Sequence, residues 1–329
     1  MKKWLKIILG IAFILVLISA ILFTTFLKDH YLPEPNLTGT LSEETITSNN
    51  QERTFLWYAP KKITTNTIIF VLHGSTGTGK GVREQTAYEF DQIADREGFV
   101  VVYPTGYFNH WNDCRGSADY KANTENIDDI SFLKAVERIL SKKLDRSFTH
   151  RFATGHSNGG HFCFKLALEE PDWISGIAAI SANLPIDSNL DCQKSGRFIP
   201  LLLINGTDDP VNPYNGGLVS ILGNDSRGTV MSSDETMNYW LGLGNCASTP
   251  TQQKIDNINS KDQSTVELST WQCNGQSTAS LYKINGGGHT IPHTKSIMPK
   301  ILGVTNQDIN AAEEIWQFFS KIERSLLIN

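Results

Sequence analysis

The chain has 329 residues, of which 40% are hydrophobic, and its formal net charge is -5. This length and apolar content allow one large domain with a substantial core, whereas the mild charge and the lack of a basic stripe argue against a nucleic-acid partner. Neither a CxxC nor an HExxH spacing occurs, so we expect no metal and no other cofactor.

The first 28 residues resemble a membrane-targeting segment. Lys2, Lys3 and Lys6 precede an apolar run from Ile7 to Leu27. As a helix, about 21 residues extend about 31 Å, which matches the hydrocarbon core of a bilayer. The apolar region of a signal peptide is shorter, so we favour an uncleaved membrane anchor over a cleaved signal. The lysines should stay in the cytoplasm, which places the rest of the chain outside it, anchored or secreted.

A polar stretch follows the apolar run. Residues 29–50 contain Pro33 and Pro35 and are predicted to be a tether, so that residues 51–329 form the folded domain. Within that domain, hydrophobic periodicity predicts an edge strand at 53–58 and further strands at 67–72, 99–103, 148–154, 176–181, 199–204 and 280–284. It predicts helices at 86–97, 128–143, 233–243 and 310–327, and one that begins at residue 158.

The alternation of strands and helices predicts a mostly parallel central sheet with helices on both faces. Residues 245–275 interrupt this pattern, because they are rich in Asn, Ser and Gln. We interpret them as a surface insertion.

The predicted strand at 67–72 runs into HGSTGTGKG at residues 73–81, for which two interpretations compete. The spacing from Gly74 to Lys80 matches a phosphate loop, but Gly81 stands where Ser or Thr should hold magnesium. Alternatively, a His-Gly after the third strand places one backbone N–H, here that of Ser75, where it stabilises an oxyanion. We favour the oxyanion loop and expect His73 to be structural.

The loop from Pro104 to Ala118 carries several aromatic side chains, among them Tyr107, Phe108 and Trp111. We expect this loop to line a pocket and take Trp111 as a candidate substrate-binding residue.

The sequence FTHRFATGHSNGGHFCFKLAL at residues 148–168 holds the most informative motif. Gly155-His156-Ser157-Asn158-Gly159 stands between a predicted strand and a predicted helix. A strand that turns sharply into a helix at a serine is the nucleophile elbow of α/β-hydrolases. The glycines avoid clashes between a Cβ and the neighbouring strand and helix. We therefore predict that Ser157 is a nucleophile and that the backbone N–H of Asn158 is a second oxyanion donor.

An acid and a base follow the serine in the order that this fold requires. Asp209 comes just after the predicted strand at 199–204 and is the candidate acid, with the adjacent Asp208 as its main rival. His289 follows the last predicted strand and is flanked by glycines. Because an α/β-hydrolase orders its triad as serine, acid and histidine, we predict that His289 is the general base and that Asp209 orients it.

The chain contains five cysteines, which fits an exported protein. Cys246 and Cys273 are the preferred disulfide pair, because their bridge would close the polar insertion. Cys114 and Cys192 form the remaining pair, although a sequence does not prove connectivity. Cys163 lies on the helix behind Ser157, and we expect it to be a buried free thiol.

These motifs together resemble the secreted esterase family that includes polyhydroxybutyrate depolymerases and feruloyl and acetylxylan esterases. The resemblance runs from about Arg53 to Phe319 and is carried by RTFLWYAP, VLHG, FVVVYPTG, IDD, GHSNGG, INGTDDPVNPYNGG and GGGHTIP. The family's glycine-threonine-x-aspartate-proline pattern falls on Gly206 to Pro210, which selects Asp209 over Asp208. The resemblance implies an α/β-hydrolase fold and a serine carboxylic-ester hydrolase that works through an acyl-enzyme.

Two departures from the family concern the substrate. The family often has a tryptophan two residues after its histidine, and this chain has Ile291 there, which makes Ile291 a second candidate substrate-binding residue. No separate domain for solid polyester is visible, so soluble or oligomeric esters are the expected substrates. The alternatives are a peptidase or amidase with the same triad and a non-catalytic module that binds polysaccharide.

Overall fold

The structure is a computed structural model that describes residues 23–273 and 277–326, together with residues 4, 9, 12, 15 and 19. Most of the predicted anchor at residues 1–28 therefore lies outside the described residues. From that segment, Phe23–Leu27 form a short helical turn, η1. Within the part of the chain that the structure describes, no helix is both long and apolar enough to cross a membrane.

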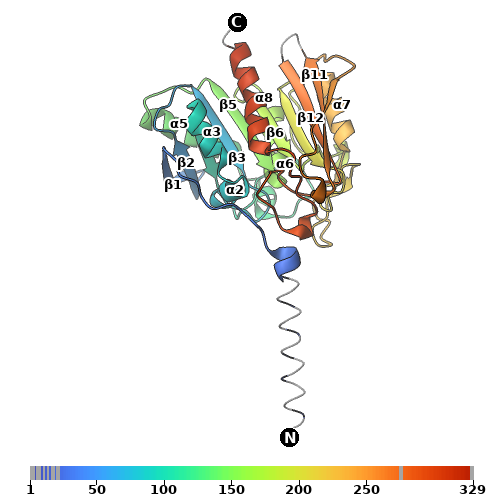
Figure 1. Cartoon of the computed structure of the whole chain (residues 1–329). Coiled ribbons are helices and arrows are strands. Elements are labelled where there is room, and N and C mark those ends of the chain that lie inside the picture. Colours follow the sequence, from blue (N-terminus) through green and yellow to red (C-terminus); the bar gives the residue numbers. More distant parts are fainter. Residues whose placement is uncertain are drawn as a thin grey trace.

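A ten-stranded sheet forms the centre of the molecule (Figure 1). Its order is β1-β2-β4-β3-β5-β6-β7-β12-β11-β10, and the strands from β4 to β12 in this order run parallel. The strands are β1 (Thr40–Ser48), β2 (Gln51–Ala59), β3 (Thr67–Leu72), β4 (Val100–Pro104), β5 (His150–His156), β6 (Gly176–Ile180), β7 (Leu201–Gly206), β10 (Thr251–Lys254), β11 (Thr265–Cys273) and β12 (Ser277–Asn285). A separate hairpin pairs β8 (Gly217–Leu218) with β9 (Thr229–Val230).

Helices cover both faces of the sheet. Strand β3 shows why, because Ile68 and Phe70 belong to the core on one face whereas Ile69 and Val71 belong to the core on the other. Helices α5, α6 and α7 pack on the first face, and α2, α3 and α8 pack on the second. The helices are α2 (Gly79–Gln85), α3 (Glu89–Glu97), α4 (Lys121–Thr124), α5 (Asp129–Lys143), α6 (Asn158–Glu169), α7 (Ser233–Leu243) and α8 (Ala311–Leu326), with shorter turns η2 (Asp187–Asn189), η3 (Ser260–Asp262) and η4 (Lys300–Leu302).

The N-terminal boundary of the sheet differs from the prediction. Part of the predicted tether, residues 40–48, forms β1 and pairs antiparallel with β2 along its whole length. The edge strand is therefore β1, not the strand predicted at 53–58. The sequence feature that marks this β1–β2 hairpin is Asn49-Asn50. Their φ angles of 50° and 62° are both positive, as a two-residue hairpin turn requires.

The predicted surface insertion at 245–275 is also partly regular structure. It contributes β10 and β11, which extend the sheet beyond β12 by antiparallel pairing. Their polar composition misled the prediction, because all of β10 is exposed. Periodicity also missed α2, since the predicted helix at 86–97 corresponds only to α3.

Both predicted disulfides are confirmed. Cys246 bonds to Cys273, and Cys114 bonds to Cys192. Cys163 is a buried free thiol, as expected. Two disulfides indicate that the domain folds in an oxidising compartment outside the cytoplasm, because cytosolic thiols are kept reduced.

Candidate active site

The predicted elbow is a sharp turn between β5 and α6. Ser157 adopts φ 55° and ψ -118°, a strained conformation that persists only where its surroundings enforce it. Its N–H donates to the carbonyl of Ile180 at 2.8 Å. A Cβ on Gly155 would stand 2.3 Å from the carbonyl carbon of Gly159, and a Cβ on Gly159 would stand 2.4 Å from the oxygen of Leu72. Only glycine fits these positions, so α6 and β3 can approach the turn.

Asp209 and His289 form a buried pair beside this turn. Asp209 follows β7, and its Oδ2 lies 2.8 Å from Nδ1 of His289. The other carboxylate oxygen, Oδ1, accepts the N–H groups of Val211 and Asn212, each at 2.8 Å. The rival Asp208 is exposed, and its carboxylate accepts a hydrogen bond from the hydroxyl of Thr207 at 3.0 Å. Of the two acids, the structure brings Asp209 to the histidine.

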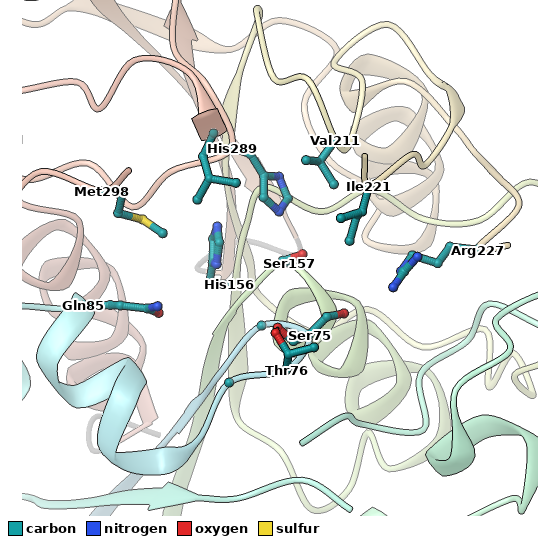
Figure 2. A pocket seen from close by; sticks show the side chains of 13 residues that line it. Ser75, Thr76, Gln85, His156, Ser157, Val211, Ile221, Arg227, His289 and Met298 are labelled. Carbon is teal, nitrogen blue, oxygen red and sulfur yellow. The ribbon is translucent and has the colours of Figure 1, made fainter. Parts of the chain in front are cut away.

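Ser157 and His289 line one cavity of about 300 Å³, together with Ser75, His156, Arg227 and other residues. Figure 2 shows the imidazole of His289 above Ser157, with Ser75 on the opposite side of the serine. No hydrogen bond joins the serine hydroxyl to the imidazole in the described part of the chain. Such contacts are often loose without substrate and tighten when it binds.

The loop after β3 curves around the serine as an oxyanion loop would. A Cβ on Gly74 would lie 3.3 Å from the Cβ of Ser157, so the loop passes directly against the elbow. The N–H of Ser75 has no partner within the residues that the structure describes, and that of Asn158 is among the first of α6, where helical N–H groups lack a carbonyl partner. These are the two predicted donors.

His73 holds this loop in place and is structural, as expected. Its Nε2 accepts the N–H of Gly106 at 2.9 Å, and its Nδ1 lies 2.7 Å from the carbonyl oxygen of Gly74. Burial lowers its pKa to about 4, so the ring is neutral near pH 7. The competing phosphate-loop interpretation loses support, because Lys80 is 78% exposed on α2 and faces Glu84.

The structure does not bring the two candidate substrate-binding residues to the cavity. Trp111 is fully buried and donates from its indole Nε1 to the carbonyl of His73 at 2.9 Å. Ile291 is 3% exposed and packs in the core on the α8 side. Both predictions are corrected: Trp111 packs under the loop after β3, and Met298, which contacts Ile291, lines the cavity instead.

The sequence analysis did not find a buried charged network that lies behind the serine. Asp113 accepts from Arg115 at 2.5 Å, from the hydroxyl of Tyr120 at 2.6 Å and from the side-chain amide of Asn158 at 2.7 Å. Burial alone would raise the pKa of Asp113, but Arg115 and the hydrogen bonds lower it to about 2. The network fixes the residue next to Ser157 and keeps a negative charge under the elbow.

Because of this lowered pKa, the free energy of unfolding should depend on pH in the acidic range. The folded pKa of Asp113 lies below its unfolded value of 3.8, so its contribution is complete above about pH 4 and is lost as pH falls toward 2. We expect this group to contribute about 2 kcal/mol to the wild-type free energy of unfolding at neutral pH. In Asp113→Asn that part of the pH dependence should disappear in urea unfolding between pH 5 and 2.

Asp145→Asn is the matched control, because Asp145 is an exposed loop residue. This control should keep the wild-type pH dependence. An Asp113→Asn variant with an unchanged acid slope would contradict the assigned charge of Asp113.

A second histidine also lies in the cavity. The ring of His156 packs against that of His289, with centroids 4.8 Å apart. Burial and the neighbouring His289 hold the pKa of His156 well below its usual range, so a neutral ring faces the predicted base. In the sequence, only its place in the motif indicates that His156 lies at the cavity, since it occupies the variable position before the serine.

Comparisons with known proteins show which proteins this chain is similar to. The pattern of a family described as putative esterase matches residues 46–283, a range that ends shortly before His289. A putative esterase of Nocardia uniformis subsp. tsuyamanensis is 24% identical over 257 residues, which cover 76% of this chain and 73% of that protein. A probable acetylxylan esterase of Aspergillus clavatus is 23% identical over 281 residues, covering 77% of this chain and 85% of that protein.

Other relatives are larger than the matched region. A bifunctional acetylxylan esterase/xylanase of Neocallimastix patriciarum is 28% identical over 160 residues, which are 48% of this chain and 21% of that protein. In fold, an acetyl xylan esterase from Aspergillus awamori superposes with a TM-score of 0.53 at 16% identity, covering 85% of this chain and 99% of that chain. Because the family pattern spans most of the sequence, this chain belongs to the putative esterase family and is a carboxylic ester hydrolase.

Proposed function

We propose that this esterase uses Ser157, His289 and Asp209 as a catalytic triad. The observation that carries the proposal is the Asp209–His289 pair at 2.8 Å, which opens on the same cavity as the strained Ser157. A carboxylate at Nδ1 fixes the imidazole tautomer, so that Nε2 is free to accept a proton. A serine hydroxyl needs such a base, because it is a weak nucleophile at neutral pH.

The reaction then has two halves. In the first, Nε2 of His289 takes the hydroxyl proton as the oxygen of Ser157 bonds to the ester carbonyl carbon. The N–H groups of Ser75 and Asn158 stabilise the oxyanion, and the alcohol leaves with the proton from His289. In the second, His289 deprotonates water, which attacks the acyl-enzyme, and Ser157 leaves with that proton.

For the substrate, we propose soluble or oligomeric esters like those of polyhydroxybutyrate depolymerases and of feruloyl and acetylxylan esterases. The cavity of about 300 Å³ supports a small acyl or aryl group. For the location, we propose that the domain works outside the cytoplasm and that residues 1–28 attach it to a membrane. The apolar run from Ile7 to Leu27 supports this attachment.

A fluorophosphonate probe tests the mechanism, because it bonds only to an activated serine. We expect one stoichiometric adduct, located on Ser157 by peptide mass spectrometry, with loss of activity toward nitrophenyl acetate and nitrophenyl butyrate. A matched nitroanilide should react far more slowly than the ester, whereas comparable rates would favour an amidase. An unlabelled protein, or an adduct on another serine, would refute the proposal.

A further inference from the structure

Arg227 lines the active-site cavity and forms no ion pair within the described part of the chain. It immediately precedes Gly228 and strand β9, and its side chain lines the cavity with Ser157 and His289. Figure 2 shows the guanidinium directed at the space beside Ser157, on the side away from Gln85. The catalytic steps proposed above do not use this residue.

Most of the guanidinium is buried. Arg227 is 9% exposed, and its Nε and Nη1 atoms are buried with no hydrogen-bond partner among the residues that the structure describes. It forms no salt bridge with any residue that the structure describes. An arginine stays charged in proteins, and a buried charge without a partner is costly unless something else pairs with it. A negatively charged group beside this guanidinium would therefore stabilise it.

The neighbouring carboxylates are already engaged elsewhere. Asp113 is bound by Arg115 and by the hydroxyl of Tyr120. Asp119 is exposed and accepts the hydroxyl of Ser226 at 2.8 Å. Burial, followed by the like charge of Arg115, lowers the pKa of Arg227, and the charges of Asp119 and Asp113 only partly oppose this shift.

Hydrogen bonds and a disulfide fix the loop that carries Arg227. The side-chain amide of Asn189 donates to the carbonyls of Arg227 and Thr229, at 3.1 and 3.0 Å. The carbonyl of Asn189 accepts the N–H of Gly116 at 2.8 Å, and the Cys114–Cys192 disulfide joins the same two segments. Because these contacts fix the loop, less conformational entropy is lost when the planar guanidinium of Arg227 binds an anion than when a mobile surface arginine does.

We propose that Arg227 binds a carboxylate on the substrate, so that the preferred esters carry a free carboxylate near the scissile bond. Monoesters of dicarboxylic acids and short hydroxyacid oligomers with a free acid end belong to this class. The inference rests on the proposed serine-esterase function and adds the identity of one substrate group. A carboxylate matches the guanidinium, because both are planar and can form two parallel hydrogen bonds.

Matched ester pairs test the inference. Mono-nitrophenyl esters of glutaric, adipic and suberic acid are compared with their methyl-capped diesters, and meta- and para-acetoxybenzoate are compared with their methyl esters. These pairs place the charge on the acyl side or on the alcohol side. In the wild type, kcat/KM of at least one charged ester should exceed that of its neutral partner by about 10- to 100-fold.

In Arg227→Gln the charged-to-neutral ratio should fall to about one, and Arg227→Lys should keep part of the preference. Arg138→Gln is the matched control, because it removes an exposed arginine from α5, and it should retain the wild-type ratio. If the wild type shows no preference in any pair, or if Arg227→Gln lowers both members of each pair equally, the inference is wrong. The wild-type ratio and Arg227→Lys decide the matter if Arg227→Gln does not fold.

Binding of N-methyladipamic acid, the amide analogue of monomethyl adipate, separates this inference from the proposed mechanism, because the ligand carries the carboxylate but no ester that the enzyme would hydrolyse. Titration calorimetry should show about tenfold weaker binding to Arg227→Gln than to the wild type. Equal binding would overturn the role of Arg227 even if the enzyme is active. A loss of binding in an enzyme that hydrolyses no ester would support Arg227 and refute the proposed catalysis.

Discussion

Ser157→Ala should lower kcat for nitrophenyl acetate by about 10⁴-fold or more, close to the spontaneous rate. The hydroxyl is the only group removed, and the backbone bonds of the elbow, such as the 2.8 Å contact to Ile180, do not involve it. The variant should therefore fold like the wild type. Initial rates, corrected for spontaneous hydrolysis, and a thermal melt measure the two effects.

Ser181→Ala provides a matched control for this substitution. Ser181 is also buried at the end of a central strand and has a positive φ of 51°, and its hydroxyl has no hydrogen-bond partner among the described residues. It does not line the cavity in the described part of the chain. Its alanine variant should keep wild-type activity. Full turnover by Ser157→Ala would rule out Ser157 as the nucleophile.

Asp209→Asn should lower kcat by roughly 10³- to 10⁴-fold with little change in KM. The N–H groups of Val211 and Asn212 both donate to Oδ1, so the amide oxygen of the asparagine must take that position. Its NH₂ group then faces Nδ1 of His289 and donates to it. The imidazole proton moves to Nε2, where it prevents the ring from accepting the proton of Ser157.

Asp208→Asn is the neighbouring control, since Asp208 is exposed and does not contact the histidine. We expect this variant to retain activity within a factor of about two. The pH dependence of kcat/KM, measured for both variants, distinguishes a lost base from a general loss of stability. If the two variants were equally impaired, the acid would have to be reassigned.

The sequence predicted the parts of the site that depend on local structure. The elbow is fixed by glycines that stand next to Ser157 in the chain, and Asp209 follows a strand that its own apolar run identifies. The burial of the helices followed from periodicity, as in α7, whose bounds at Ser233–Leu243 are those predicted. In these cases the physical cause lies within a few residues of the effect.

The remaining features depend on contacts between distant segments. Trp111 was predicted at the cavity because loop aromatics often line pockets, but it is held under the loop by His73, 38 residues earlier. Arg227 is an ordinary loop arginine in the sequence, and only the fold shows that it is buried and that no described carboxylate pairs with it. Strand β1 was missed because its side chains are mostly polar, so the segment was predicted to be a tether.

The pairing of His30 with Ile297 joins the segment before β1 to the cavity wall. Their backbones exchange hydrogen bonds of 2.8 and 3.2 Å, and Ile297 precedes Met298, which lines the cavity. Turn η1 also contacts η4, which contains the lining residue Leu302. A trimmed enzyme that starts after residue 30 would free this wall, so kinetic selectivity is best determined on protein that retains residues 23–30.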